Sequence, residues 1–105
     1  KVIPIGTNVF VQMVFNSVVQ VVRSGAPDMA MVRNEDNVVT VQALTEGVNS
    51  NITVKTADGL YYSYKIVSDE NEDIPLFYEV PISDAVNAQS KLIEDSKKKI
   101  VEKMR

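Results

Sequence analysis

Two runs of alternating apolar and polar residues flank an Asp-Gly pair, and this arrangement limits most strongly what the chain can fold into. The runs cover residues 51–56 and 60–67, and Ala57-Asp58-Gly59 separates them. Alternation with a period of two gives a strand one buried side and one solvent side. Asp-Gly favours a type I′ turn, which needs positive φ at both central residues. The stretch Asn49–Val67 is therefore predicted to be a β-hairpin.

Further short runs with the same character occur on both sides of this hairpin. Turn residues separate them, such as Ser24-Gly25-Ala26-Pro27 and the polar stretch 34–37. Prolines at 75 and 81 bracket the last run and restrict it to the edge of a sheet. The predicted strands are Asn8–Phe15, Val18–Val22, Asp28–Arg33, Val38–Leu44 and Leu76–Ile82.

The composition fits a core made of sheets. The chain has 105 residues, the length of one domain, and it contains eighteen valines but three phenylalanines. Branched side chains of this kind pack well on pleated surfaces. Six or seven short strands in a chain of this length predict an all-β fold, an immunoglobulin-like β-sandwich covering residues 1–82.

The pattern changes to a helical period after residue 82. Apolar residues recur at helical spacing through a lysine-rich segment, and Ser83 or Asp84 is the expected N-cap. Residues 83–105 are predicted to form an amphipathic helix, or a connector to a downstream domain. Its apolar stripe is too narrow to stabilise it alone, so we expect it to pack on the sandwich, on a partner or on the next domain of a longer protein.

Charge is distributed unevenly along the chain. Residues 91–105 hold six basic and three acidic side chains, a net +3, so the total of −3 leaves the first 90 residues at −6. Nucleic-acid affinity depends largely on phosphate neutralisation, so direct binding of nucleic acid is not expected.

Several kinds of chemistry lack the residues they need. The chain has no histidine, cysteine or tryptophan, which removes most nucleophile–base pairs and the common transition-metal ligands. We therefore expect no enzyme, no catalytic residue, no cofactor and no metal site. The acidic stretch 69–73 offers carboxylate oxygens to calcium, but its spacing matches no EF-hand loop, and a solvated loop is the favoured interpretation.

Three tyrosines in the second hairpin strand are the candidate interaction surface. Tyr61 should face one side of the sheet, whereas Tyr62 and Tyr64 should face the other. We favour core packing for one face and a cross-strand pair for the other, and a partner-binding role for these rings remains the alternative.

Parts of the chain resemble the N-terminal domain of the TraN family of Bacteroides-type conjugative transposons. The similarity lies in the amino-acid sequences of the predicted strands at Thr7–Phe15, Val19–Val22 and Asn37–Ala43, and in that of the hairpin from Asn51 to Tyr64. It implies a subunit of a conjugative transfer apparatus, related in role to the TrbG/CagX subunits of type IV secretion. A subunit of this kind is periplasmic or outer-membrane-associated, and its partners are other subunits of the complex.

Function is thus expected to rest on contacts between proteins. The leading hypothesis is a non-catalytic structural domain of an envelope transfer complex, which forms oligomers or larger assemblies. The alternative is a carbohydrate-binding or adhesin-type module that uses the tyrosines. A third hypothesis is an inert accessory domain of a larger enzyme.

Overall fold

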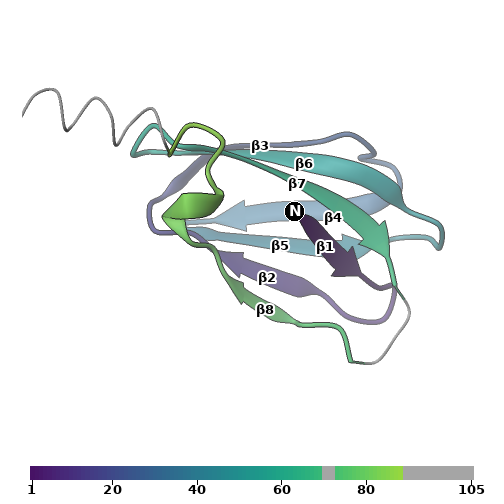
Figure 1. Cartoon of the computed structure of the whole chain (residues 1–105). Helices are drawn as coiled ribbons and strands as arrows, with labels where there is room; N and C mark the ends of the chain where they lie inside the picture. Colours follow the sequence, from purple (N-terminus) through teal and green to yellow (C-terminus); the bar gives the residue numbers. More distant parts are fainter. Residues whose placement is uncertain (70–72, 89–105) are drawn as a thin grey trace, which may run out of the picture.

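A computed structural model describes residues 1–69 and 73–88. Within these residues the protein is a β-sandwich of two four-stranded sheets, as the sequence predicts (Figure 1). The first sheet has the order β1 (Val2–Ile5), β7 (Tyr61–Ser68), β6 (Asn49–Thr56), β3 (Val19–Ser24). The second has the order β4 (Ala30–Glu35), β5 (Val38–Ala43), β2 (Val11–Val14), β8 (Phe77–Glu79).

The strand order is that of an immunoglobulin-like domain with additions at one side. β3, β6 and β7 correspond to the C, F and G strands, and β2, β5 and β4 correspond to B, E and D. Most neighbouring strands are antiparallel, but β1 joins β7 in parallel and β8 joins β2 in parallel. These two parallel strands lie at the same side of the sandwich, opposite β3 and β4.

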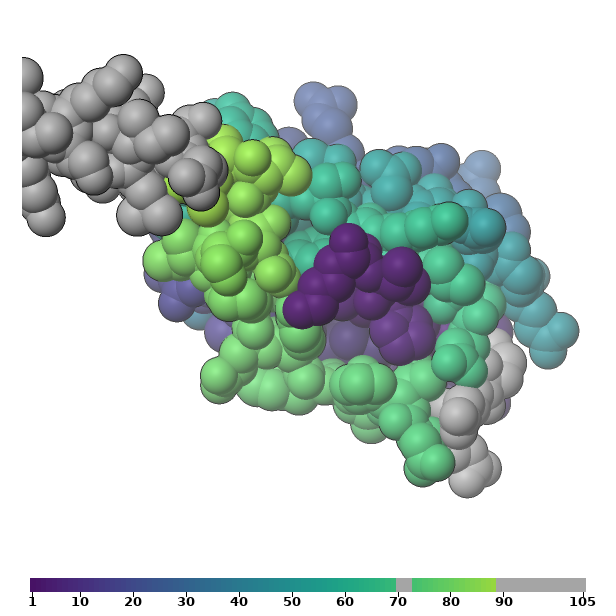
Figure 2. Space-filling model, in the orientation of Figure 1, coloured from purple at the N-terminus to yellow at the C-terminus, as the bar shows by residue number. Residues whose placement is uncertain are grey.

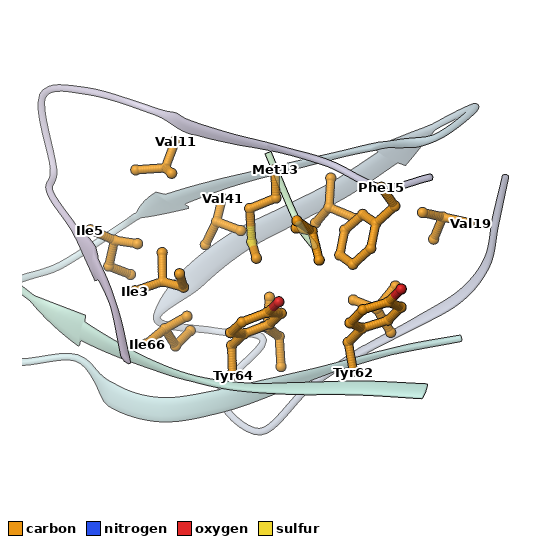
Figure 3. Packing of buried hydrophobic residues seen from close by; sticks show 14 of the residues in the cluster. Ile3, Ile5, Val11, Met13, Phe15, Val19, Val41, Tyr62, Tyr64 and Ile66 are labelled. Carbon is orange, nitrogen blue, oxygen red and sulfur yellow. The ribbon is translucent and has the colours of Figure 1, made fainter. Parts of the chain in front are cut away.

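The core lies between the two sheets and follows from the period-two alternation. Met13, Phe15 and Val41 point from the second sheet toward Tyr62 and Ile66 of the first, and all are at most 2% exposed (Figure 3). The ring of Phe15 meets that of Tyr62 edge-on, with centroids 4.9 Å apart. Such a pair adds about 0.5–1.5 kcal/mol beyond the burial of its area.

The central hairpin forms as predicted, but its turn differs from the predicted type. β6 and β7 pair in register, with Lys55 opposite Tyr61. Gly59 has φ +84°, whereas Asp58 does not have positive φ, so the type I′ prediction was wrong. The N–H of Gly59 donates to the carbonyl of Thr56 and the N–H of Thr56 donates to Leu60, which closes a three-residue loop. Loops of this length commonly end in a left-handed glycine.

Residues 83–87 do not begin a helix. Ile82–Asp84 form a single 3-10 turn, preceded by Pro81, and Ala85 returns to an extended conformation with φ −62° and ψ 135°. The predicted N-cap at Ser83 or Asp84 was therefore wrong, because the backbone is extended at Ala85, directly after both residues, and the Asp84 carboxylate accepts from tyrosine hydroxyls instead. The rest of the predicted helix, from residue 89 onward, lies outside the described residues.

Candidate interaction surface

The three candidate tyrosines lie in different environments. Tyr62 and Tyr64 are each 1% exposed and belong to the core, so they present no surface to a partner. Tyr61 is 42% exposed, and the Lys55 ammonium lies 5.8 Å from its ring centroid. Alternation along β7 explains the division, because its even-numbered residues face the second sheet. Of the trio, Tyr61 is therefore the side chain placed to contact another molecule.

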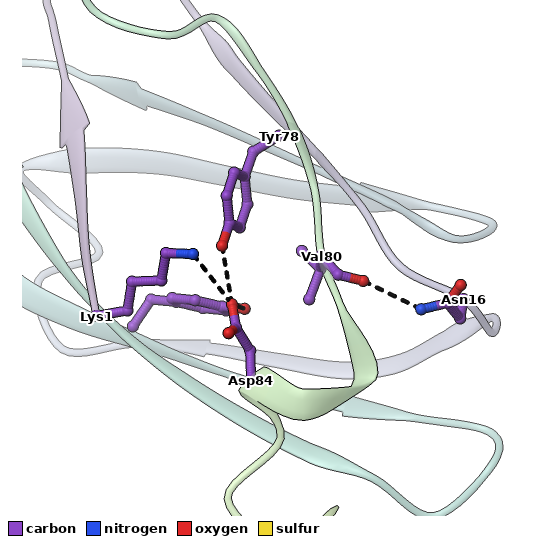
Figure 4. A network of polar contacts seen from close by, with 6 residues as sticks. Lys1, Asn16, Tyr78, Val80 and Asp84 are labelled. Carbon is purple, nitrogen blue, oxygen red and sulfur yellow. Dashed lines mark hydrogen bonds and ion pairs between the residues drawn. The ribbon is translucent and has the colours of Figure 1, made fainter.

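Asp84 gathers polar groups from three elements at one end of the sandwich (Figure 4). Its Oδ2 accepts hydrogen bonds from the hydroxyls of Tyr64, at 2.8 Å, and Tyr78, at 2.9 Å. The Lys1 ammonium lies 3.5 Å from the same oxygen and 4.3 Å from the centroid of the Tyr78 ring. The carboxylate thereby joins the N-terminal residue, just before β1, to β7 and β8.

Burial and this carboxylate also change the acidity of the tyrosines. Burial raises the pKa of the Tyr64 hydroxyl well above its ordinary value of 10, and the hydrogen bond to Asp84 raises it further. Burial likewise raises the pKa of Tyr62, with smaller contributions from the charges of Asp58 and Asp84. Both hydroxyls are therefore neutral at physiological pH, and that of Tyr64 donates its hydrogen bond to Asp84.

The segment Ile74–Ala88, here called the closing segment, covers the end of the sandwich. Its backbone follows β2, where the N–H of Val80 donates to Val14 and the Asn16 amide donates to the carbonyl of Val80 (Figure 4). The Asn87 side chain then accepts a hydrogen bond from the N–H of Tyr61 and donates one to Gly59. In Figure 2 this green segment lies directly beside the purple N-terminal residues.

The two sides of the sandwich differ in how their edge strands are protected. On one side, Pro4 lies within β1, and Pro75 and Pro81 flank the three-residue β8. Proline cannot donate to a strand ladder, so this side is poorly suited to accept another strand. On the other side, β3 and β4 are six residues long and contain no proline. We call this the open side.

β4 is the more regular of the two strands on the open side. β3 carries a register shift between Val19 and Val21, whereas β4 pairs with β5 without interruption from Ala30 to Glu35. The N–H of Leu44 on the β5 side donates to the carbonyl of Met29, so residues 29 and 44 form a hydrogen-bonded pair. From this pair onward, hydrogen-bonded and non-hydrogen-bonded pairs alternate along the antiparallel ladder. This alternation directs the peptide groups of Val32 and Asn34 away from β5, toward the open side.

Two hollows border β4. One, of about 550 Å³, lies over the outer face of the second sheet, where Gln12, Thr40 and Arg33 form a row across three strands. The other, of about 560 Å³, lies along the open side and includes Val22 of β3 and Leu44. Met31, Arg33 and Asn34 line both hollows. β4 is therefore an exposed ridge with room for side chains on either side.

Charge on the open side is mixed within an acidic domain. Arg23 on β3 and Arg33 on β4 are exposed, and they are the two arginines within the described residues. Glu35 follows Arg33 by two residues, so the two side chains share the outer face of β4. The edge strand thus presents a positive and a negative group side by side.

Within residues 1–69 and 73–88, no group of three or more acidic side chains lies close enough together to hold a metal ion. The same part of the chain contains no helix long and apolar enough to cross a membrane. The acidic stretch 69–73, predicted to be a solvated loop with calcium binding as the weaker alternative, has residues 70–72 outside the described residues.

The features that distinguish the open side are hard to recognise from the sequence. Arg33 and Glu35 stand in a predicted strand, but nothing in the local pattern shows that this strand lies at an edge. The available signal is the distribution of proline, which marks the opposite side at positions 4, 75 and 81, whereas Pro27 lies in the loop between β3 and β4 and in neither strand.

Comparison with known proteins gives a family without an assigned activity. No curated protein matches the chain. Residues 3–72, more than half of its 105 residues, match the model of a domain of unknown function, DUF8473. The match runs from β1 through β7, and β8 with the rest of the closing segment lies beyond it. The chain is a member of the DUF8473 family.

Proposed function

We propose that this domain is a non-catalytic structural module that acts by protein–protein contact in a bacterial envelope complex of the conjugative-transfer type. The observation that supports the contact is the unequal protection of the two sides of the sandwich. Prolines and a short strand protect the side of β1 and β8, whereas β4 presents an uninterrupted edge. An exposed edge of this kind accepts an extended segment by main-chain hydrogen bonding.

The resemblance to TraN proteins supplies the kind of complex. Its similar stretches coincide with β2, β3, β5 and the β6–β7 hairpin, which together form the framework of both sheets. β4 lies outside those stretches. The strands that resemble TraN would therefore form a shared scaffold. The exposed edge of β4, which this scaffold positions, would make the contact.

The carbohydrate-binding alternative retains one of its three tyrosines. Tyr61 is exposed beside Lys55 at the rim of the first sheet, and no hollow described above includes it. If this alternative is correct, binding to a glycan array should require the Tyr61 ring, and Tyr61→Ala should abolish it while Asn34→Pro has no effect.

Site-specific photo-crosslinking in the native host tests the assembly proposal. A photoreactive residue at position 34 of the full-length protein should form adducts with a transfer-complex subunit. The control is the same residue at position 63, where Ser63 is exposed on the outer face of the first sheet. Equal adducts at both positions, or none at position 34, would contradict the proposed contact.

A genetic test addresses the conjugative part of the proposal. Asn34→Pro removes an N–H at the free edge of β4 without removing a hydrogen bond to β5, so the domain should still fold. The transfer frequency of the mobile element should fall in Asn34→Pro. It should remain unchanged in the control variant Ser63→Ala, which alters an exposed residue on the outer face of the first sheet. Unchanged transfer in Asn34→Pro would argue against a role in conjugation.

A further inference from the structure

We propose that the open edge of β4 pairs with β4 of a second copy of this chain, antiparallel about a two-fold axis at Asn34. The inference rests on the proposed function, because it names the occupant of the edge to which that function assigns the contact. It requires a backbone able to pair, side chains that are complementary to themselves, and space for the second strand.

The backbone of β4 meets the first requirement. The peptide groups of Val32 and Asn34 point toward the open side, as the alternation from the Leu44–Met29 bond requires. A two-fold axis at Asn34 makes the two Asn34 residues a hydrogen-bonded pair that exchanges both N–H groups. In this register Val32 lies opposite Asp36 of the second copy, where the chain leaves the strand and the carbonyl already accepts from Val19, so the main-chain exchange is confined to Asn34.

The side chains select this register. With the axis at Asn34, Arg33 lies opposite Glu35 of the second copy, and Glu35 lies opposite its Arg33. Because these are positions without mutual main-chain hydrogen bonds, their side chains approach most closely. An axis at Arg33 would instead place two like charges opposite each other, and an axis at Val32 would place Arg33 opposite Met31.

Space is available on both faces of the paired strands. The hollows of about 550 and 560 Å³ lie on either side of Met31, Arg33 and Asn34, so the second strand meets no covering element there. The overlap is short, since the chain turns at Asp36, where φ is +52°. We therefore expect a weak association that becomes important where copies are concentrated in an assembly.

Charge exchange tests the pairing by sedimentation velocity over a range of protein concentrations. The wild-type chain should show reversible dimerisation below about 1 mM. Arg33→Glu and Glu35→Arg should each weaken it about tenfold or more, because each variant places like charges opposite one another twice. The double variant Arg33→Glu/Glu35→Arg should restore it, and so should an equal mixture of the two single variants.

Matched controls separate this pairing from general effects of charge. Arg23→Glu makes the same charge change on β3 and should leave dimerisation unchanged, whereas Asn34→Pro should abolish it. Thermal unfolding of each variant checks that the fold is intact. A wild-type chain that stays monomeric to about 1 mM, or a double variant that fails to restore association, would overturn the inference. Cross-links from position 34 to a different subunit, with a monomeric purified chain, would overturn it while leaving the proposed function standing.

Discussion

At the scale of single residues, Asp84 is the side chain that connects the most distant parts of the described chain. One of its oxygens serves two tyrosine hydroxyls and a lysine, and one of those hydroxyls belongs to Tyr64 in the core. Removing a partner from a buried hydroxyl costs more than removing both partners together. This asymmetry allows the cluster to be tested by combining substitutions.

Asp84→Ala should lower the free energy of unfolding by about 1–3 kcal/mol, because it leaves the Tyr64 hydroxyl without its acceptor. Asp84→Asn should cost less, since an amide oxygen can still accept. The measurement is urea denaturation followed by circular dichroism. In the Tyr64→Phe background the cost of Asp84→Ala should shrink, and an unchanged cost would show that the cluster is not the cause.

The raised pKa of Tyr64 predicts a loss of stability in alkali. The folded state holds this proton more tightly than the unfolded state, so the stabilisation is complete below pH 10 and is lost progressively above it. Each tyrosine of this kind contributes a slope of about 1.4 kcal/mol per pH unit above pH 10. Urea denaturation between pH 9 and about pH 11 should show a shallower slope for Tyr64→Phe, and an identical slope would contradict the assignment.

Gly59 is the residue on which the hairpin turn depends. Its φ of +84° is a conformation that side chains with a Cβ adopt at a cost, although the space around it is open. Gly59→Ala should therefore destabilise the protein by about 1 kcal/mol, and Gly59→Asn should destabilise it less, because asparagine tolerates this conformation better. Equal midpoints in urea for the two variants would show that backbone conformation is not the cause.

At the scale of elements, β1 is a strand that the sequence pattern does not predict. Residues 2–5 are four consecutive apolar residues without alternation and include a proline, so the local pattern gives no reason to expect a strand. β1 exists because β7, whose paired residues come 63 positions later, offers it a parallel partner. The hairpin of residues 49–67 was predictable because all of its determinants are local, whereas the pairing of β1 and β8 depends on distant strands.

Ile5→Ala should cost about 2–5 kcal/mol if β1 is integral to the core, because Ile5 is fully buried. Val2→Ala in the same strand should change stability by less than about 0.5 kcal/mol, because Val2 is 53% exposed. Chemical denaturation of the two variants gives the comparison. Similar costs at both positions would mean that β1 does not pack as described.

The candidate site followed the same division between local and distant determinants. The opposite facing of Tyr61 and Tyr62 came directly from alternation along one strand. The exposure of β4 did not, since Arg33 and Glu35 belong to an ordinary strand pattern until the order of the second sheet places them at its edge. Edges are a property of the sheet and not of the strand.

At the scale of the whole molecule, the parallel strands bring the beginning and the end of the described chain together. β1 pairs with β7, β8 pairs with β2, and Lys1 meets Asp84. Pairings this distant in sequence require large loops to close before they stabilise the chain. The fold therefore depends on cooperation across its full length.

Refolding after dilution from urea should accordingly take milliseconds to seconds, as in other sandwiches dominated by distant pairing. Stopped-flow fluorescence of the tyrosines follows the reaction without added labels, because the chain contains no tryptophan. Refolding complete within about 100 microseconds would contradict this dependence on distant contacts.

The prolines of β1 and β8 also limit how far association through strands could extend. A sandwich with two receptive sides can add copies indefinitely and grow into a filament. Here a symmetric pair through β4 would use the same edge in both copies. Of the other edges, β1 and β8 carry or adjoin Pro4, Pro75 and Pro81, and β3 is irregular, with a register shift between Val19 and Val21. Such a pair is closed by its own symmetry, so growth would stop at two. The protein would thereby associate through one exposed strand edge without forming filaments.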